Sequence, residues 1–340
     1  MKQTKCERDN WFDVIKFIAS FFVICIHIPL VGGKFAIAVN AFARFAVPTF
    51  FAISGFYAYQ ADAKAVKRRL IKTFRLYLIS SAIYHTRSIV SYIAEQGVTG
   101  LVNYALDVFC NVENVMSFLF FNTPFTSVHL WYLLALMYVY LIWLVILKYS
   151  LDDKIIFLIG AFTILANLVL GELLSAFGIV LDVICVRNFA FTGLPFFIFG
   201  YLLRKYNHLL TKIKPIYLII AIVVGSFEQV LSRFLFGHNE VFIGSVLCCF
   251  SIILLVKKIK PIDLSDKAIV IFRSSGDIYV FHLLFSGILD ALANILPSAL
   301  KTVIVFLLPC WAFGLCIVFS LLKTKIIRYL SVSKAQKNTV

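Results

Sequence analysis

Residues 12–31 read FDVIKFIASFFVICIHIPLV, a run that is apolar except at a few positions. A helix of roughly 20 apolar residues is long enough to cross the hydrocarbon core of a bilayer. The run lacks the small-residue cleavage site of a secretory signal peptide, and many similar runs follow it. We therefore expect a transmembrane helix that stays in the protein.

The rest of the chain repeats this pattern. Of the 340 residues, 61% are hydrophobic and only 14% are charged, whereas an average soluble domain has about 25% charged residues. The composition predicts an all-α, polytopic transmembrane helical bundle of about ten helices. It occupies a single domain at residues 1–330, and a short basic tail follows at 331–340. The expected spans lie at 12–31, 41–61, 76–94, 129–147, 155–171, 188–203, 216–235, 241–256, 275–295 and 302–322.

The basic residues indicate the orientation. From residue 88 to residue 147 there is no Lys or Arg, although Glu95, Asp107 and Glu113 are present. Cytoplasmic loops are rich in Lys and Arg, so ten spans with both termini in the cytoplasm place the basic loops inside. This topology explains most of the net charge of +15. The basic residues are also attracted to the anionic headgroups of the lipid bilayer. We expect no nucleic-acid partner, because the aromatic residues lie in the spans and not beside a basic face.

Polar residues on the first span share one face. Asp13, Lys16, Ser20 and His27 are separated by 3, 4 and 7 residues, which places them within about 60° of one another on a helix. A charge at the centre of a membrane costs about 2.5–3.5 kcal/mol, so this stripe is expected to face other helices or a cavity. Two interpretations stay open. In the first, Lys16 reaches the lipid headgroups and pairs with Asp13, and His27 is a histidine at the membrane interface. In the second, Lys16 and His27 take part in catalysis.

The ninth span carries a second stripe, formed by Ser275, Tyr279, His282 and Ser286 at steps of 4, 3 and 4. Such a stripe is typical of polar contacts between helices. Ser54 is a further polar candidate, on the second span.

Other signatures are missing from the sequence. No Walker loop, HExxH or GxSxG motif and no metal-ligand spacing is present, so we expect no metal site. Cys110 and Cys185 both fall in expected outside loops, where they form a disulfide or remain free thiols.

Two segments together resemble a known family. Residues 13–27 (DVIKFIASFFVICIH) and 47–56 (VPTFFAISGF) are similar to the first two helices of the acyltransferase 3 family, membrane-bound enzymes that modify bacterial envelope glycans. Weaker similarities are HLWYL at 129–133 and SGDIYVFH at 275–282. Where the family commonly has an arginine on the first helix, this chain has Lys16. Residues 131–136 (WYLLAL) replace the Trp-Ser-Leu signature of the larger members, so the chain looks closer to the short, single-domain branch.

The resemblance implies a bacterial plasma-membrane enzyme that transfers an acyl group, in the first instance acetyl, from cytoplasmic acyl-CoA. The acceptor is a hydroxyl of an envelope glycan or a lipid-linked saccharide, and no cofactor is permanently bound. His27 acts as general base or as transient acyl carrier. The implied catalytic residues are His27, Lys16, Ser54 and His282, and the implied residues for the acyl-CoA phosphates are Lys16, Arg68, Arg69, Lys72 and Arg75.

Two alternatives remain at this point. The polar helix face also suits a transporter or flippase for a small polar molecule, such as an amino acid or a lipid-linked sugar. A structural or sensory membrane protein is the third interpretation.

Overall fold

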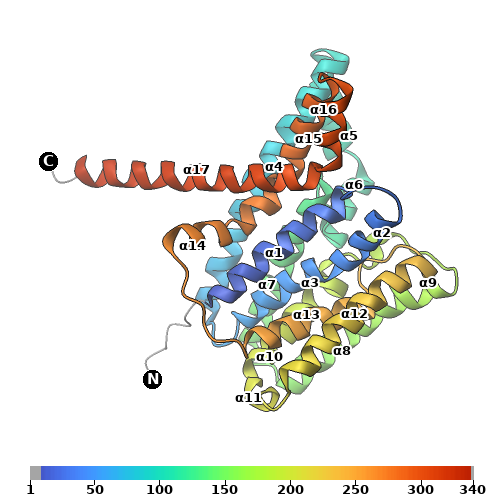
Figure 1. Cartoon of the computed structure of the whole chain (residues 1–340), viewed down its shortest axis with the longest axis vertical. Coiled ribbons are helices and arrows are strands. Elements are labelled where there is room, and N and C mark those ends of the chain that lie inside the picture. The colour runs from blue at the N-terminus through green and yellow to red at the C-terminus, as the bar shows by residue number, and fades with distance from the viewer. Residues whose placement is uncertain (1–8, 338–340) are drawn as a thin grey trace. The chain divides into compact units, whose positions relative to one another are not determined.

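The computed structural model describes the backbone of residues 9–337 and the side chains of residues 9–331. In this part of the chain the regular elements are helices, without strands (Figure 1). They form two compact units. We call residues 9–46 and 256–337 the terminal unit, and residues 47–255 the central unit.

The terminal unit contains the first helices and the last ones. Its elements are α1 (Asn10–His27), α2 (Gly33–Phe42), η1 (Ala43–Phe45), α14 (Asp266–Phe272), α15 (Ser275–Asn294), α16 (Ser298–Phe306) and α17 (Leu308–Lys337). Helix α1 begins where the Asp9 carboxylate accepts a hydrogen bond from the Trp11 backbone N–H, at 3.0 Å. Such a cap satisfies one of the free N–H groups at the start of a helix. The helix ends at His27, two residues before Pro29.

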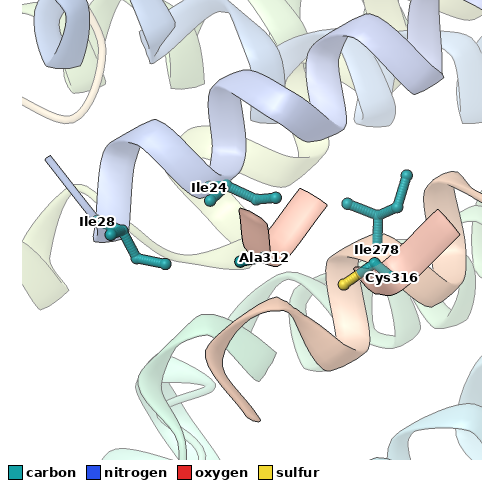
Figure 2. Packing of buried hydrophobic residues seen from close by; sticks show 5 residues of the cluster. All are labelled: Ile24, Ile28, Ile278, Ala312 and Cys316. Carbon is teal, nitrogen blue, oxygen red and sulfur yellow. The ribbon is translucent and has the colours of Figure 1, made fainter. Parts of the chain in front are cut away.

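Helices α1 and α15 run in the same direction. At their starting ends, Arg273 Nε donates to Asp13 Oδ2 at 3.0 Å. Farther along, the rings of His27 and His282 have centroids 5.4 Å apart. Ile24 of α1 and Ile28, which follows the last residue of α1, join a buried apolar cluster with Ile278 of α15 and with Ala312 and Cys316 of α17 (Figure 2). Helix α17 returns against α15, since Ser320 and Lys323 both contact Asp277 at the start of α15.

The central unit is a larger set of helices. They are α3 (Ala46–Phe56), α4 (Ala63–Gln96), α5 (Thr99–Phe109), α6 (Val112–Phe121), η2 (Val128–Leu130), α7 (Trp131–Lys148), α8 (Asp153–Leu168), η3 (Val169–Leu173), α9 (Leu174–Ala176), η4 (Val183–Cys185), η5 (Phe189–Gly193), α10 (Leu194–Lys205), α11 (Asn207–Leu210), α12 (Pro215–Phe236) and α13 (Ile243–Val256). Glycines allow α3 and α10 to touch backbone to backbone. A Cβ atom added at Gly55 would lie 1.8 Å from the Phe197 carbonyl oxygen, and one at Gly200 would lie 1.9 Å from that of Ala52. Small residues of this kind are typical of helix contacts in membranes.

The structure confirms an all-α, polytopic membrane fold. Seven helical segments of the described chain are long and apolar enough to cross a bilayer: Asn10–His27, Gly33–Phe56, Val128–Lys148, Asp153–Ala176, Pro215–Phe236, Ser275–Asn294 and Leu308–Ser331. The other three expected spans correspond to parts of α4, α10 and α13. Ten crossings, the cytoplasmic termini and the single domain therefore stay predictions. The tail expected at 331–340 lies mostly outside the described side chains.

Two details of the expected pattern were wrong. The second span was expected at 41–61, but it begins at Gly33, ends at Phe56 and is interrupted by η1. The segment expected as one long loop at 95–128 contains α5 and α6. Helix α5 forms because its buried Tyr104 packs back onto α4, where its hydroxyl lies 2.5 Å from His85 Nδ1.

Candidate functional site

The structure brings together two of the predicted site residues, His27 and His282. His27 is the last residue of α1 and is half-buried, whereas His282 lies on α15 and is fully buried. Their ring centroids are 5.4 Å apart and their planes are inclined by 36°. The two polar stripes found in the sequence therefore meet at this pair.

Backbone carbonyl groups fix the orientation of His282. Its Nδ1 lies 2.9 Å from the carbonyl oxygen of Tyr279 and 3.1 Å from that of Ile278. A carbonyl oxygen can only accept, so Nδ1 carries the hydrogen. In the neutral imidazole, Nε2 is then the acceptor nitrogen, as a base or a positioning group requires.

A half-buried amide supports the end of α1. Asn40 Nδ2 donates to the backbone carbonyl oxygen of Ile26, next to His27, at 3.0 Å. The same amide accepts a hydrogen bond from Arg44 Nη2, also at 3.0 Å, and Arg44 is buried. This arrangement holds the last turn of α1 against α2 and η1. Asn40 was not identified from the sequence. The only feature that could have indicated it is that it is an amide residue in the apolar second half of α2.

The starting end of α1 carries an ionic cluster. The buried Asp13 carboxylate binds Lys16 Nζ at 2.9 Å and Arg273 Nε at 3.0 Å. The pairing of Lys16 with Asp13 agrees with one of the two interpretations of the sequence. The cluster has one negative and two positive charges, so a net positive charge remains at this end. Arg273 was not singled out as a site residue, because its place beside Asp13 depends on the packing of α15.

The remaining predicted residues belong to the central unit. The Ser54 hydroxyl donates to the backbone carbonyl oxygen of Phe50 at 2.8 Å, a local bond that serves the helix itself. Arg69 is half-buried and donates to the Tyr57 carbonyl oxygen at 2.8 Å, at the end of α3. Arg68, Lys72 and Arg75 are exposed on α4. Their spacing of 4 and 3 puts them on one helix face.

The predicted absence of a metal site and the two cysteines of the expected outside loops were also compared with the structure. Among the residues that the structure describes, no group of three or more His, Cys, Asp and Glu side chains could hold a metal ion. Cys110 and Cys185 are both free thiols.

Comparison with known proteins identifies the family. The model of the acyltransferase 3 family, described as an acyltransferase domain, matches residues 9–329, which include nearly all of both units. No curated protein and no solved structure matches the chain. The family match favours an enzyme over the transporter and structural alternatives. The chain therefore belongs to the acyltransferase 3 family and is a membrane acyltransferase.

Proposed function

We propose that this acyltransferase moves an acetyl group from acetyl-CoA to a hydroxyl of an envelope glycan or a lipid-linked saccharide. The observation that supports this proposal is the pairing of His27, the last residue of α1, with His282 in the first half of the parallel helix α15. An imidazole has an unperturbed pKa near working pH and is the commonest general base in enzymes. A histidine whose ring lies against a second, oriented histidine is suited to accept a proton from a hydroxyl.

The reaction balances with His27 as the base. His27 takes the proton of the acceptor hydroxyl while the hydroxyl oxygen attacks the thioester carbonyl carbon. The carbon–sulfur bond then breaks, the CoA thiolate leaves, and the proton passes from His27 to the sulfur. His282 positions the His27 ring during both transfers. A transient acyl group on His27 is the alternative route, and it would be trapped as an acyl-imidazole when the acceptor is withheld.

The donor would be held by basic residues. Phosphate groups of acyl-CoA are strong acceptors for Lys and Arg, and the cluster of Asp13, Lys16 and Arg273 keeps a net positive charge. The other proposed phosphate ligands are Arg68, Arg69, Lys72 and Arg75. Eleven residues separate Lys16 from His27, or roughly 16 Å along a helix. An extended pantetheine arm bridges such a gap and brings the thioester to His27.

The proposed location is the bacterial plasma membrane with both termini in the cytoplasm. The support is the distribution of Lys and Arg among the loops. In this orientation the Lys16 end of α1 faces the cytoplasmic pool of acyl-CoA, and the His27 end faces the envelope.

The test is the content of base-labile O-acyl groups in the envelope glycans of cells with wild type, His27→Ala or neither protein. We expect these groups only with wild type, because His27→Ala removes the base. His208→Ala is the matched control, because His208 is exposed on α11, and it should keep full activity. Equal membrane levels of all variants must be shown by immunoblot. Full O-acylation with His27→Ala would contradict the mechanism, and identical glycans in all cells would contradict the acceptor class.

A further inference from the structure

A cavity lies in the central unit, at the end of α4 and beside the segment that precedes η2. Its volume is about 280 Å³. The lining residues are Tyr84, Arg87, Ser88, Ser91, Tyr92, Glu95, Thr126 and Ser127. None of them belongs to the site described above.

Most of the side chains that line the cavity carry a hydroxyl group. Six of its eight side chains are Ser, Thr or Tyr, and the other two, Arg87 and Glu95, have opposite charges. The Thr126 hydroxyl oxygen is buried and has no hydrogen-bond partner among the described residues. A buried hydroxyl without a partner is costly, so this atom is suited to a polar ligand.

The walls of the cavity are held in place by their neighbours. The ring of Tyr92 packs edge-on against Tyr104 with centroids 5.2 Å apart. Ser127 Oγ lies 2.8 Å from His129 Nδ1, and the His129 ring packs on Tyr84 at 4.9 Å. A site whose side chains are fixed before binding loses less entropy when a ligand enters.

These features select a class of ligand. The opposite charges of Arg87 and Glu95 leave the lining with no net charge, which disfavours phosphates and therefore acyl-CoA. At about 280 Å³ the cavity lies just below the usual range of small-molecule pockets, about 300–1,000 Å³, so its size suits one small ring and not a chain of several. A sugar ring offers hydroxyls at its edge for the Ser, Thr, Arg and Glu groups, and apolar C–H faces for the tyrosine rings.

From this combination of size, hydroxyl-bearing lining and opposite charges, we propose that the cavity at the end of α4 binds one uncharged monosaccharide unit of the acceptor. This inference rests on the proposed function, because it names the part of the chain that holds the acceptor. The distribution of basic residues predicts that this end of α4 lies at the outer face of the membrane. An envelope glycan is present on that side.

The test measures binding to the full-length protein in lipid nanodiscs. The probes are methyl glucoside, methyl mannoside and methyl rhamnoside, and the readout is saturation-transfer NMR, which detects weak binding. Ser91→Leu fills the cavity with an apolar side chain, and Arg87→Gln removes its cation without adding bulk. The matched control is Thr86→Leu, because Thr86 is exposed on the same helix and does not line the cavity.

We expect at least one glycoside to bind to wild type and to Thr86→Leu. In Ser91→Leu and in Arg87→Gln its dissociation constant should rise about tenfold or more, a loss of affinity that titration resolves. The proposal is overturned if no glycoside binds to wild type, or if the glycoside binds equally to all variants. A thermal unfolding curve shows whether each variant is folded.

A transfer assay separates this inference from the proposed function. If glycosides bind as expected but no cell glycan is O-acylated, the proposed function fails and a saccharide site remains. If glycans are O-acylated and Ser91→Leu leaves the KM for the acceptor unchanged, the cavity is not the acceptor site. In that case the assignment of His27 stands.

Discussion

At the scale of single residues, His282 is the group whose role the structure changes most. On the sequence alone its stripe was best explained as polar contact between helices. The structure places its ring 5.4 Å from His27, with Nδ1 directed to two backbone carbonyl groups. It therefore has the fixed orientation that a positioning residue needs.

We predict that His282→Ala lowers kcat on the order of 100-fold, the size of effect expected when a reacting group is displaced by about 1 Å. The KM for acetyl-CoA should stay within about twofold, because an interaction that acts only in the transition state changes kcat. Steady-state kinetics of the purified enzyme in detergent check both values. His238→Ala is the matched control, since His238 is exposed and belongs to the central unit. A rise in KM with unchanged kcat would show that His282 binds substrate instead.

The candidate site was only partly predictable from the sequence. His27 and Lys16 could be found because a polar stripe in an apolar helix has a recognisable period. Asn40 and Arg273 could not, because they reach α1 only through tertiary packing. His282 was among the implied catalytic residues, but its place beside His27 depends on the same packing. Sequence spacing reports which residues share a helix face, and it does not report which helix lies opposite.

At the scale of helices, hydrophobic runs gave the spans and close packing decides how they fit. Gly55 and Gly200 are each in direct contact with the backbone of the other helix, α10 or α3. No apolar run predicts such a contact. The break of the second span at η1 and the helices α5 and α6 were likewise not expected from hydropathy. Helix α5 packs back onto α4 through the buried Tyr104.

We predict that Gly200→Ala destabilises the protein by at least about 1–3 kcal/mol, the usual cost of overpacking. The new Cβ would meet the Ala52 carbonyl oxygen at 1.9 Å, so α3 and α10 must separate. Gly314→Ala is the matched control, because a Cβ at Gly314 on α17 meets no atom within 4 Å. Thermal unfolding in detergent should show a lower Tm for Gly200→Ala only. Equal Tm values for the two variants would mean that the helices adapt without cost.

At the scale of the whole molecule, the direction of α1 and α15 constrains the number of crossings. If both helices span the membrane and run in parallel, the chain between them must cross an odd number of times. Four segments long and apolar enough to span lie between them in the described chain, and four is even. If all four of these segments cross, at least one of α4, α10 and α13 must cross as well. If all three cross, the total is ten, the number that the hydropathy and the basic residues predict.

The last prediction tests this topology by labelling single cysteines in intact cells with a membrane-impermeant maleimide. The native cysteines are first replaced by serine. We expect Val98→Cys, after α4, and Phe177→Cys, after α9, to react from outside the cell. Both side chains are highly exposed, and both lie next to chain segments poor in Lys and Arg. Lys212→Cys and Lys258→Cys lie in basic loops and should react only after the cells are permeabilised. The candidate spans between residues 98 and 212 are α7, α8 and α10. If α7 and α8 both cross, they return the chain to the side of residue 98. Labelling of residues 98 and 212 from opposite sides therefore requires α10 to cross as well. Labelling of residues 98 and 212 from the same side would remove α10 from the spans and contradict the ten-helix topology.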